Sequence, residues 1–121
     1  MTARWVASKK MHTPRSHHSS CSLGKNVYVF CGRNYQYTML NSIEWLNAEA
    51  DASGETVGWL EIPVHSSVGF TKRFYALAAP VDTDKILIGG GLESIYDFMS
   101  DKFILNTTTN VLEKQANGFY D

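Results

Sequence analysis

Short apolar runs, each stopped by glycine, proline, asparagine or aspartate, recur along the whole chain of 121 residues. Runs of four to eight residues with such boundaries are typical of antiparallel strands. No window holds apolar residues at the 3.6-residue spacing of an amphipathic helix. The alanine-rich stretch 46–55 is predicted to be a long loop, with one helical turn as the alternative. The pattern predicts eight strands, at 16–23, 27–31, 42–47, 57–62, 74–80, 85–89, 101–106 and 110–115.

The two halves of the chain repeat the same order of strands. The segment "NVYVFCG" (26–32) matches "DKILIGG" (84–90) at an offset of 58 residues. The segment "NSIEWLN" (41–47) matches "SDKFILN" (100–106) at an offset of 59. A nearly constant offset between similar segments is the pattern of a repeat protein.

Arg15 and Arg73 extend this repeat, because they precede the first strand of each copy at the same offset of 58. We therefore predict two units of four strands, residues 13–63 and residues 64–121. Residues 1–12, which include "RWVAS", are predicted to supply the outer strand of a preceding or partner unit.

Composition narrows the function classes without naming one. The net charge is −1, and the lysines and arginines are scattered, so the chain lacks the basic patch of a nucleic-acid or anionic-membrane binder. No apolar run approaches the roughly 18 residues that cross a bilayer. The first fifteen residues lack the apolar stretch of a secretory signal, so we expect a cytoplasmic protein.

Cys21 and Cys31 are too few for a disulfide framework. A bridge across a hairpin is the alternative, but in a reducing compartment we expect two buried thiols.

The apolar run at 85–88 ends in three glycines, and a glycine also follows the run at 27–31. A residue without Cβ lets backbones approach closely and permits positive φ. A phosphate-binding loop is the alternative, but it requires a helix start and a spaced glycine motif that 89–103 does not have.

These segments, in this order, resemble the kelch-repeat family. The residues that carry the resemblance are "PRSHHSS" (14–20), "VYVFCG" (27–32), "LNSIEWLN" (40–47), Trp59, Arg73, "KILIGGG" (85–91) and "DKFILN" (101–106). The resemblance implies an all-β fold of two four-stranded antiparallel blades of a kelch-type β-propeller, forming part of a ring. In it, Gly32, Gly89 and Gly90 would relieve crowding near the axis, and Trp59 would fill the gap between blades.

Three features depart from the family pattern. Cys31 stands where the first copy would have a second glycine, and the usual aromatic residue after the glutamate is displaced, which leaves Trp45-Leu46. The second copy has Val111 and Leu112 in place of the outer tryptophan. These departures concern packing within a blade.

Two blades cannot close a ring, because closed propellers typically have four to eight and repeat arrays need about three units for stability. Three explanations remain open: a longer propeller, several copies of this chain in one ring, or a partner that covers the open faces.

The resemblance places the binding surface on the loops at one mouth of the central channel. Those loops contain the residues that we expect to contact a partner: Arg15, Ser16, Arg33, Asn34, Tyr35, Tyr37, Arg73, Phe74 and Tyr96, with Glu93 and Ser94 in the same loops. Arginine and tyrosine are common in binding hot spots. The alternative is that Arg15 and Arg73 tie neighbouring loops together.

We expect a non-catalytic protein–protein interaction or scaffold module that further blades or another chain complete. Its partners are expected to be proteins, including blades of the same or another chain, and not nucleic acid or membrane. Part of a kelch-fold enzyme, of the oxidase or sugar epimerase type, is the alternative, with Tyr35, Tyr37, His17 and His65 available.

No cofactor and no metal are expected. His12, His17, His18 and Cys21 suggest a zinc cluster, but alternation along a strand turns His18 away from the face that His17 and Cys21 share.

Overall fold

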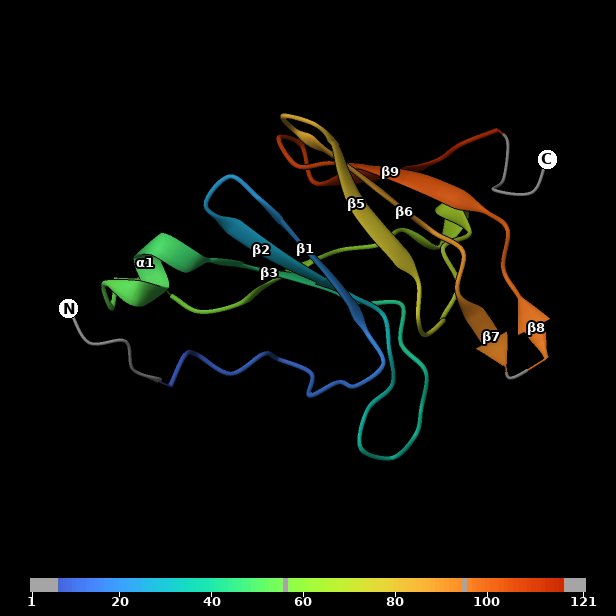
Figure 1. Ribbon diagram of the computed structural model, residues 1–121, viewed down its shortest axis with the longest axis horizontal. Coiled ribbons are helices and arrows are strands. Elements are labelled where there is room, and N and C mark those ends of the chain that lie inside the picture. The colour runs from blue at the N-terminus through green and yellow to red at the C-terminus, as the bar shows by residue number, and fades with distance from the viewer. Residues whose placement is uncertain (1–6, 56, 95, 117–121) are drawn as a thin grey trace.

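The computed structural model describes residues 7–55, 57–94 and 96–116, and two four-stranded antiparallel sheets dominate it (Figure 1). The first sheet has the order β1-β2-β3-β4, with β1 at Ser19–Leu23, β2 at Asn26–Phe30, β3 at Ile43–Asn47 and β4 at Leu60–Ile62. The second has the order β10-β9-β6-β5, with β5 at Leu77–Asp82, β6 at Lys85–Gly89, β9 at Lys102–Asn106 and β10 at Val111–Lys114. The all-β prediction is confirmed.

Each sheet is a meander of strands joined in sequence order. In the first sheet, Gly24 and Lys25 alone connect β1 to β2, since Leu23 pairs with Asn26. Gly24 has φ +61, the left-handed conformation that a two-residue hairpin turn needs. The strands β1 to β4 fall within 13–63 and the later strands within 64–121, although the unit boundaries themselves stay predictions.

Several element boundaries differ from the sequence-based expectation. The helix α1 (Ala48–Ala52) occupies part of the stretch predicted as a loop, because the Asn47 side chain caps it by accepting from the Ala50 N–H. The strand predicted at 57–62 begins only at Leu60, after Gly58 with φ +107, and the one predicted at 74–80 begins only at Leu77, after Tyr75 with φ +56.

A small hairpin and a 3-10 turn were not predicted. The hairpin pairs β7 (Leu92–Ser94) with β8 (Asp97–Phe98) between β6 and β9. The 3-10 turn η1 (Ser66–Val68) lies in the connection between the two sheets.

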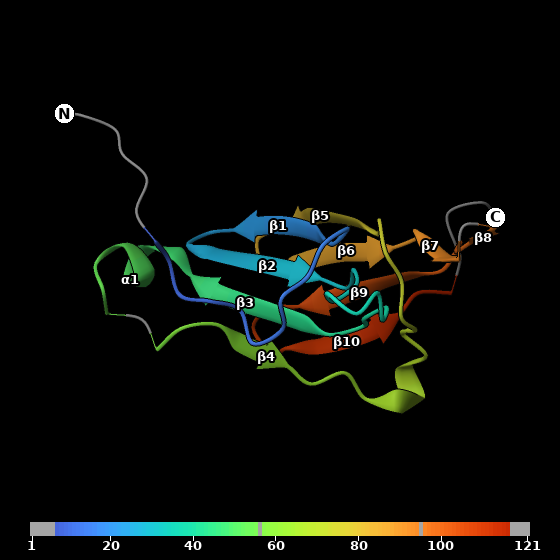
Figure 2. The same ribbon diagram turned by 90° about the horizontal axis from the view of Figure 1, so that it is seen from below.

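One apolar cluster fills the space between the two sheets, and β1 lies beside β5 where the sheets meet (Figure 2). The first sheet contributes Tyr28, Phe30 and Ile43, which alternation places on one face. The cluster is completed from the second sheet and the connection, by Phe70, Ile86, Ile88, Phe103, Leu105 and Leu112. Because both sheets share this core, they are packed as neighbouring layers.

The opposite face of the first sheet is covered by the chain's own N-terminal segment. Val29 and Leu46 on that face are buried, and residues 8–13 are fastened beside them. Trp59 Nε1 donates to the Lys9 carbonyl oxygen at 2.9 Å, and the Ser8 hydroxyl donates to Asp51 at 2.6 Å. Residues 4–6 of the predicted strand "RWVAS" lie outside the described residues, and 7–12 form no strand. Among described helices, none has the length and apolar character to span a membrane.

Candidate functional site

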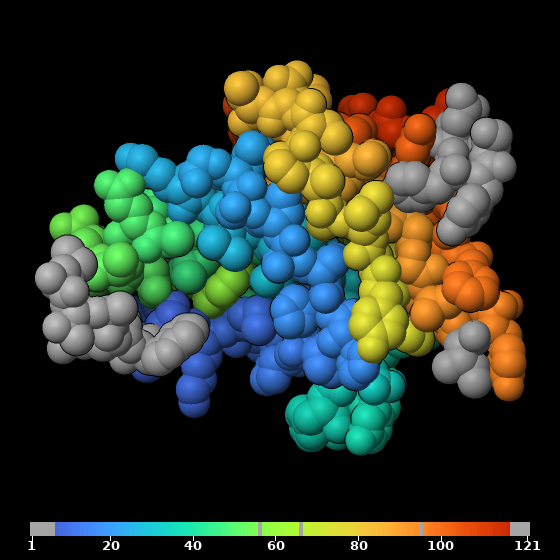
Figure 3. Space-filling model, in the orientation of Figure 1, coloured from blue at the N-terminus to red at the C-terminus, as the bar shows by residue number. Residues whose placement is uncertain are grey.

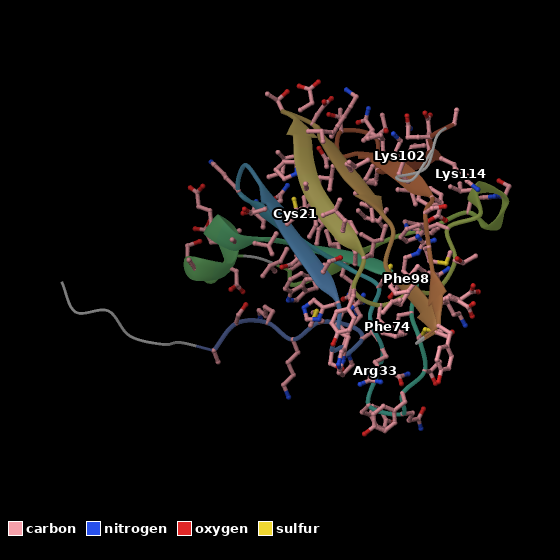
Figure 4. The ribbon with its side chains drawn as sticks, turned by 45° about the vertical axis from the view of Figure 1, so that its right-hand side comes forward. Cys21, Arg33, Phe74, Phe98, Lys102 and Lys114 are labelled. Carbon is pink, nitrogen blue, oxygen red and sulfur yellow. The ribbon has the colours of Figure 1, made fainter. Side chains whose placement is uncertain are left out.

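Four segments gather at one end of the two sheets, here called the loop end: residues 14–18, 31–42, 72–76 and 91–100. Backbone pairing joins them, since Ser16 pairs with Arg33 and Phe74 pairs with Leu92. The β2–β3 loop projects from this end (Figure 3). Figure 4 places Arg33, Phe74 and Phe98 here.

Arg15 lies beneath the surface of the loop end. Its side chain and that of Glu44 are both fully buried and form an ion pair of 2.6 Å. Arg15 also donates to the carbonyl oxygens of Cys31 and Ser42, each at 3.0 Å. Glu44 accepts further hydrogen bonds from the N–H groups of His12 (2.7 Å) and Thr13 (3.2 Å). Arg15 therefore joins the incoming segment to β3 and the β2–β3 loop.

Arg73 has the same position in the second sheet and is also buried. It holds Asp101 through two hydrogen bonds, of 2.5 and 2.9 Å, and donates to the carbonyl oxygens of Gly90 and Thr71. Its guanidinium lies 4.8 Å from the Phe70 ring centroid and 5.5 Å from that of Phe103. A bidentate carboxylate contact with two flanking aromatic rings holds a planar guanidinium in one orientation.

Arg15 and Arg73 were expected to contact a partner, but the structure places both inside the chain with local partners. Their guanidiniums are unavailable to a second protein in this conformation, because burial and hydrogen bonds to backbone oxygens occupy them. We therefore do not retain them in the binding surface. The alternative, that they tie loops together, describes what the geometry does.

The positive-φ backbone conformations at the loop end occur at corresponding positions in the two sheets. His17 and Tyr75 both have φ +56, and Cys31 and Gly90 have φ +60 and +62. The next residues, Gly32 and Gly91, have φ +93 and +86. The correspondence follows an offset of 58 or 59 residues, which matches the sequence repeat.

Gly32 and Gly91 are needed for close approach as well as for positive φ. A Cβ at Gly32 would lie 2.5 Å from the Ser16 carbonyl oxygen, and one at Gly91 would lie 2.7 Å from that of Phe74. The counterpart of Gly32 is thus Gly91, which the sequence reading missed because it aligned Gly32 with Gly90. Gly89 belongs to β6 and pairs with Leu77 and Lys102.

Large aromatic side chains cover the outside of the loop end. The exposed fractions run from 57% for Tyr75 to 84% for Tyr96. Together with His17 and Arg33 these rings form the outer layer, which consists of His17, Arg33, Tyr35, Tyr37, Tyr75, Tyr96 and Phe98. Among the predicted site residues, Arg33, Tyr35, Tyr37 and Tyr96 belong to it.

Arg33 organises the first half of the outer layer. Its Nε donates to His17 Nδ1 at 3.2 Å, and its guanidinium lies 5.0 Å from the Tyr37 ring centroid. The His17 ring meets the Tyr75 ring edge-to-face at 5.0 Å, which links the two sheets across the loop end. Non-glycine residues at positive φ are uncommon and concentrate at functional sites. His17, Tyr37 and Tyr75 all have this conformation.

The other predicted contact residues support the loops. The Asn34 side chain accepts from the N–H groups of Gln36 and Thr38, so it closes the turn of the β2–β3 loop. Ser16 is exposed, and its backbone pairs with Arg33. Phe74 is half-buried and meets the Tyr75 ring at 5.3 Å.

Sequence reasoning missed Tyr75 and Phe98 as surface residues. Tyr75 looked like an apolar strand residue, and only its left-handed backbone turns it outward. Phe98 belongs to a hairpin that was not predicted, although the sequence "LESIYDF" has the turn-forming Asp97 beside two aromatic residues.

Trp59, expected to fill the gap between blades, is half-buried against the N-terminal segment instead. Its backbone oxygen lies 2.6 Å from His12 Nε2. This contact and the bond to Lys9 hold residues 9–12 beside β4.

The Cys31 thiol is buried beneath the loop end. Burial raises the pKa of Cys31 to about 12, despite the nearby Arg73 and Arg15, which oppose the shift. Burial, and then the charge of Arg15, lowers the pKa of His18. Cys21 and Cys31 are both free and buried, as predicted.

The four suggested zinc ligands do not form a cluster. Within 7–55, 57–94 and 96–116, no three His, Cys, Asp or Glu side chains gather to hold a metal ion. His12 contacts the Trp59 carbonyl, whereas His17 contacts Arg33. His65, suggested for oxidase chemistry, bonds instead to its neighbour Ser67 at 2.7 Å.

Comparison with known proteins identifies two similar chains. One is human (Homo sapiens) Kelch domain-containing protein 1, 34% identical over 98 residues, and the other is its mouse (Mus musculus) namesake, 38% identical over 98 residues. Each match covers 80% of this chain and 22% of the relative, so the chain spans about a fifth of their length. No protein-family model matches the chain.

Proposed function

Because the chain belongs to the kelch-repeat family, we propose that it is a protein-interaction module that binds its partner through the outer layer of the loop end. The exposed aromatic rings from both blades are the observation that carries this proposal. Monomeric proteins rarely gather so many large apolar side chains on one small surface unless the surface binds something. Tyrosine and arginine are also enriched among residues that dominate binding energy.

The rigidity of the loops supports the proposal. Arg15 and Arg73 fix the backbone beneath the rings, and Asn34 closes the loop that carries Tyr35 and Tyr37. A surface that is already ordered loses less conformational entropy on binding. The buried arginines therefore contribute to binding by holding the outer layer in place.

The test is site-specific photo-crosslinking in a cell extract. A benzophenone side chain at Tyr35 or Tyr96 is expected to give the same discrete crosslinked protein from both positions. Val57, which is 86% exposed, is the control position and should not give that product. Equal labelling at Val57, or no shared product at Tyr35 and Tyr96, would contradict the proposal.

We further propose that another blade, of this or another chain, covers the outward face of the second blade. Leu77, Val81 and Val111 are each about half exposed there, and Leu87 and Ile104 lie on the same face by alternation. The relatives are several times longer than the aligned segment, which leaves room for such a blade. Blades normally bury both faces against neighbours.

Sedimentation of the purified chain tests this second proposal. The chain should associate through the open face, and Val111→Lys should shift it toward the 13.6 kDa monomer. A monodisperse monomer at all concentrations, unaffected by the substitution, would argue against an unfilled blade face.

A further inference from the structure

A groove of about 460 Å³ lies beside the outer layer. Its lining comes from three places: Met39 and Asn41 at the end of the β2–β3 loop, residues 69–72 of the connection between blades, and Glu93 of β7. The groove therefore lies between the loop that carries Tyr35 and Tyr37 and the hairpin that carries Tyr96 and Phe98.

The groove is preformed. Its Phe70 ring is buried and meets the Phe103 ring edge-to-face at 4.9 Å. The Asn41 side chain donates to the Phe70 carbonyl oxygen at 3.0 Å, and the Arg73 N–H donates to the Leu40 carbonyl oxygen at 3.1 Å. These bonds join the end of the β2–β3 loop to the connection between the blades, so the groove is formed without a ligand.

Two charges of opposite sign line the groove without partners. Lys72 and Glu93 are exposed, and within the described chain neither has a hydrogen bond or an ion pair. The backbone N–H groups of Thr71 and Lys72 likewise have no acceptor among the residues that the structure describes. Met39 supplies apolar surface to the lining, because the Phe70 ring beneath the groove is buried.

We propose that this groove binds an extended segment of the protein partner in which one apolar side chain lies between an acidic and a basic residue. The apolar side chain contacts Met39, the acidic one pairs with Lys72, and the basic one pairs with Glu93. The free N–H groups of Thr71 and Lys72 donate to oxygen atoms of the segment. The charge pairs select the partner more than they strengthen binding.

This inference rests on the proposed function, because it names the chemistry of the partner at the same end. The test is selection of a phage-displayed library of random heptapeptides on the whole chain. The unaltered chain should enrich peptides with an apolar residue between one acid and one base.

The double substitution Lys72→Glu with Glu93→Lys reverses the two charges of the groove. It should weaken binding of a selected peptide at least tenfold, and a charge-reversed peptide should restore it. The matched control is Lys25→Glu with Glu49→Lys, an exposed ion pair outside the groove, which should change neither result. Thermal unfolding of each variant confirms that it is folded.

Other outcomes overturn the inference. They are the absence of enriched peptides, or enriched sequences and affinities that the charge reversal leaves unchanged. If Tyr35→Ala with Phe98→Ala abolishes binding while the reversal has no effect, the inference fails and the proposed function stands. If crosslinking at Tyr35 and Tyr96 fails, the proposed function itself fails.

Discussion

Two layers of the loop end are built from the same short segments yet have opposite environments. Arg15 is fully buried against Glu44, whereas Arg33, in the β2–β3 loop, lies at the surface over the Tyr37 ring. The inner layer consists of Arg15 and Arg73 with their carboxylates, and its polar atoms bond mainly to the chain itself. The outer layer presents aromatic rings to solvent. Residue type alone therefore does not separate a binding residue from a structural one, because burial and local partners make that distinction.

The two blades place the carboxylate that pairs with the buried arginine at different positions. In the first blade the carboxylate is Glu44, on β3, and in the second it is Asp101, just before β9. Ser42 lies where the repeat would place the counterpart of Asp101, and Phe103 lies at the counterpart of Glu44. The arginine is thus kept with a carboxylate in both blades, while the position of that carboxylate moves by two residues along the strand.

The largest expected effect follows removal of a buried arginine. Arg15→Ala should lower the free energy of unfolding by about 3–5 kcal/mol, because it leaves the Glu44 carboxylate buried without its cation. Arg73→Ala should cost somewhat less on the charge side, since the Asp101 side chain is 16% exposed and can be hydrated. Urea denaturation measures both, with Arg33→Ala, at a half-buried arginine of the outer layer, as the control. Equal losses for Arg33→Ala and Arg15→Ala would erase the distinction between the layers.

Next come the two glycines of the repeated frame. Gly32→Ala and Gly91→Ala should each destabilise the chain by about 2–4 kcal/mol, since a left-handed backbone costs about 1–2 kcal/mol for other residues and a clash adds to it. Gly24→Ala, with φ +61 and open space around it, isolates the backbone term and should cost about 1 kcal/mol. If Gly91→Ala behaves like Gly24→Ala, the equivalence of Gly32 and Gly91 is lost.

The buried thiol of Cys31 should make the free energy of unfolding depend on pH, with an effect of intermediate size. The folded pKa of Cys31 is about 12 and its ordinary value is 9.0, so unfolding releases a proton above pH 9 and stability falls as pH rises toward 12. At pH 10.5 the unaltered chain should lose about 2 kcal/mol more than Cys31→Ser, which has no thiol. Urea denaturation at pH 7 and pH 10.5 gives the difference. Identical pH dependence of the two proteins would show that water reaches the inner layer.

The smallest effect on stability is expected in the outer layer. Tyr35→Ala and Phe98→Ala should change the free energy of unfolding by less than about 0.5 kcal/mol, because both rings are exposed. Each should nevertheless weaken partner binding by about tenfold or more, as truncation of a hot-spot aromatic residue does. Quantitative pull-down of the crosslinked partner measures this loss, and unchanged binding would remove these rings from the surface.

The strand pattern and the repeat were predictable because they depend on local apolar runs and on the glycine, proline, asparagine and aspartate residues that end them. The eight strands of the two sheets lie close to their predicted positions, and the two copies keep one offset. The β7–β8 hairpin and the positive φ of Tyr75 were not predicted, because they depend on backbone conformations that several residue types can adopt. The burial of Arg15 was also not predicted, because its partner Glu44 is distant in the sequence and looked like an ordinary polar residue of a strand.

The central claim is that the inner layer holds the loop end and the outer layer binds. It is tested most directly by measuring the free energy of unfolding and the partner affinity on the same variants, Arg15→Ala and Tyr35→Ala. The account predicts a large loss of stability for the first, and a loss of affinity at unchanged stability for the second. It would be contradicted if Tyr35→Ala bound normally, or if its loss of affinity came only with a matching loss of stability.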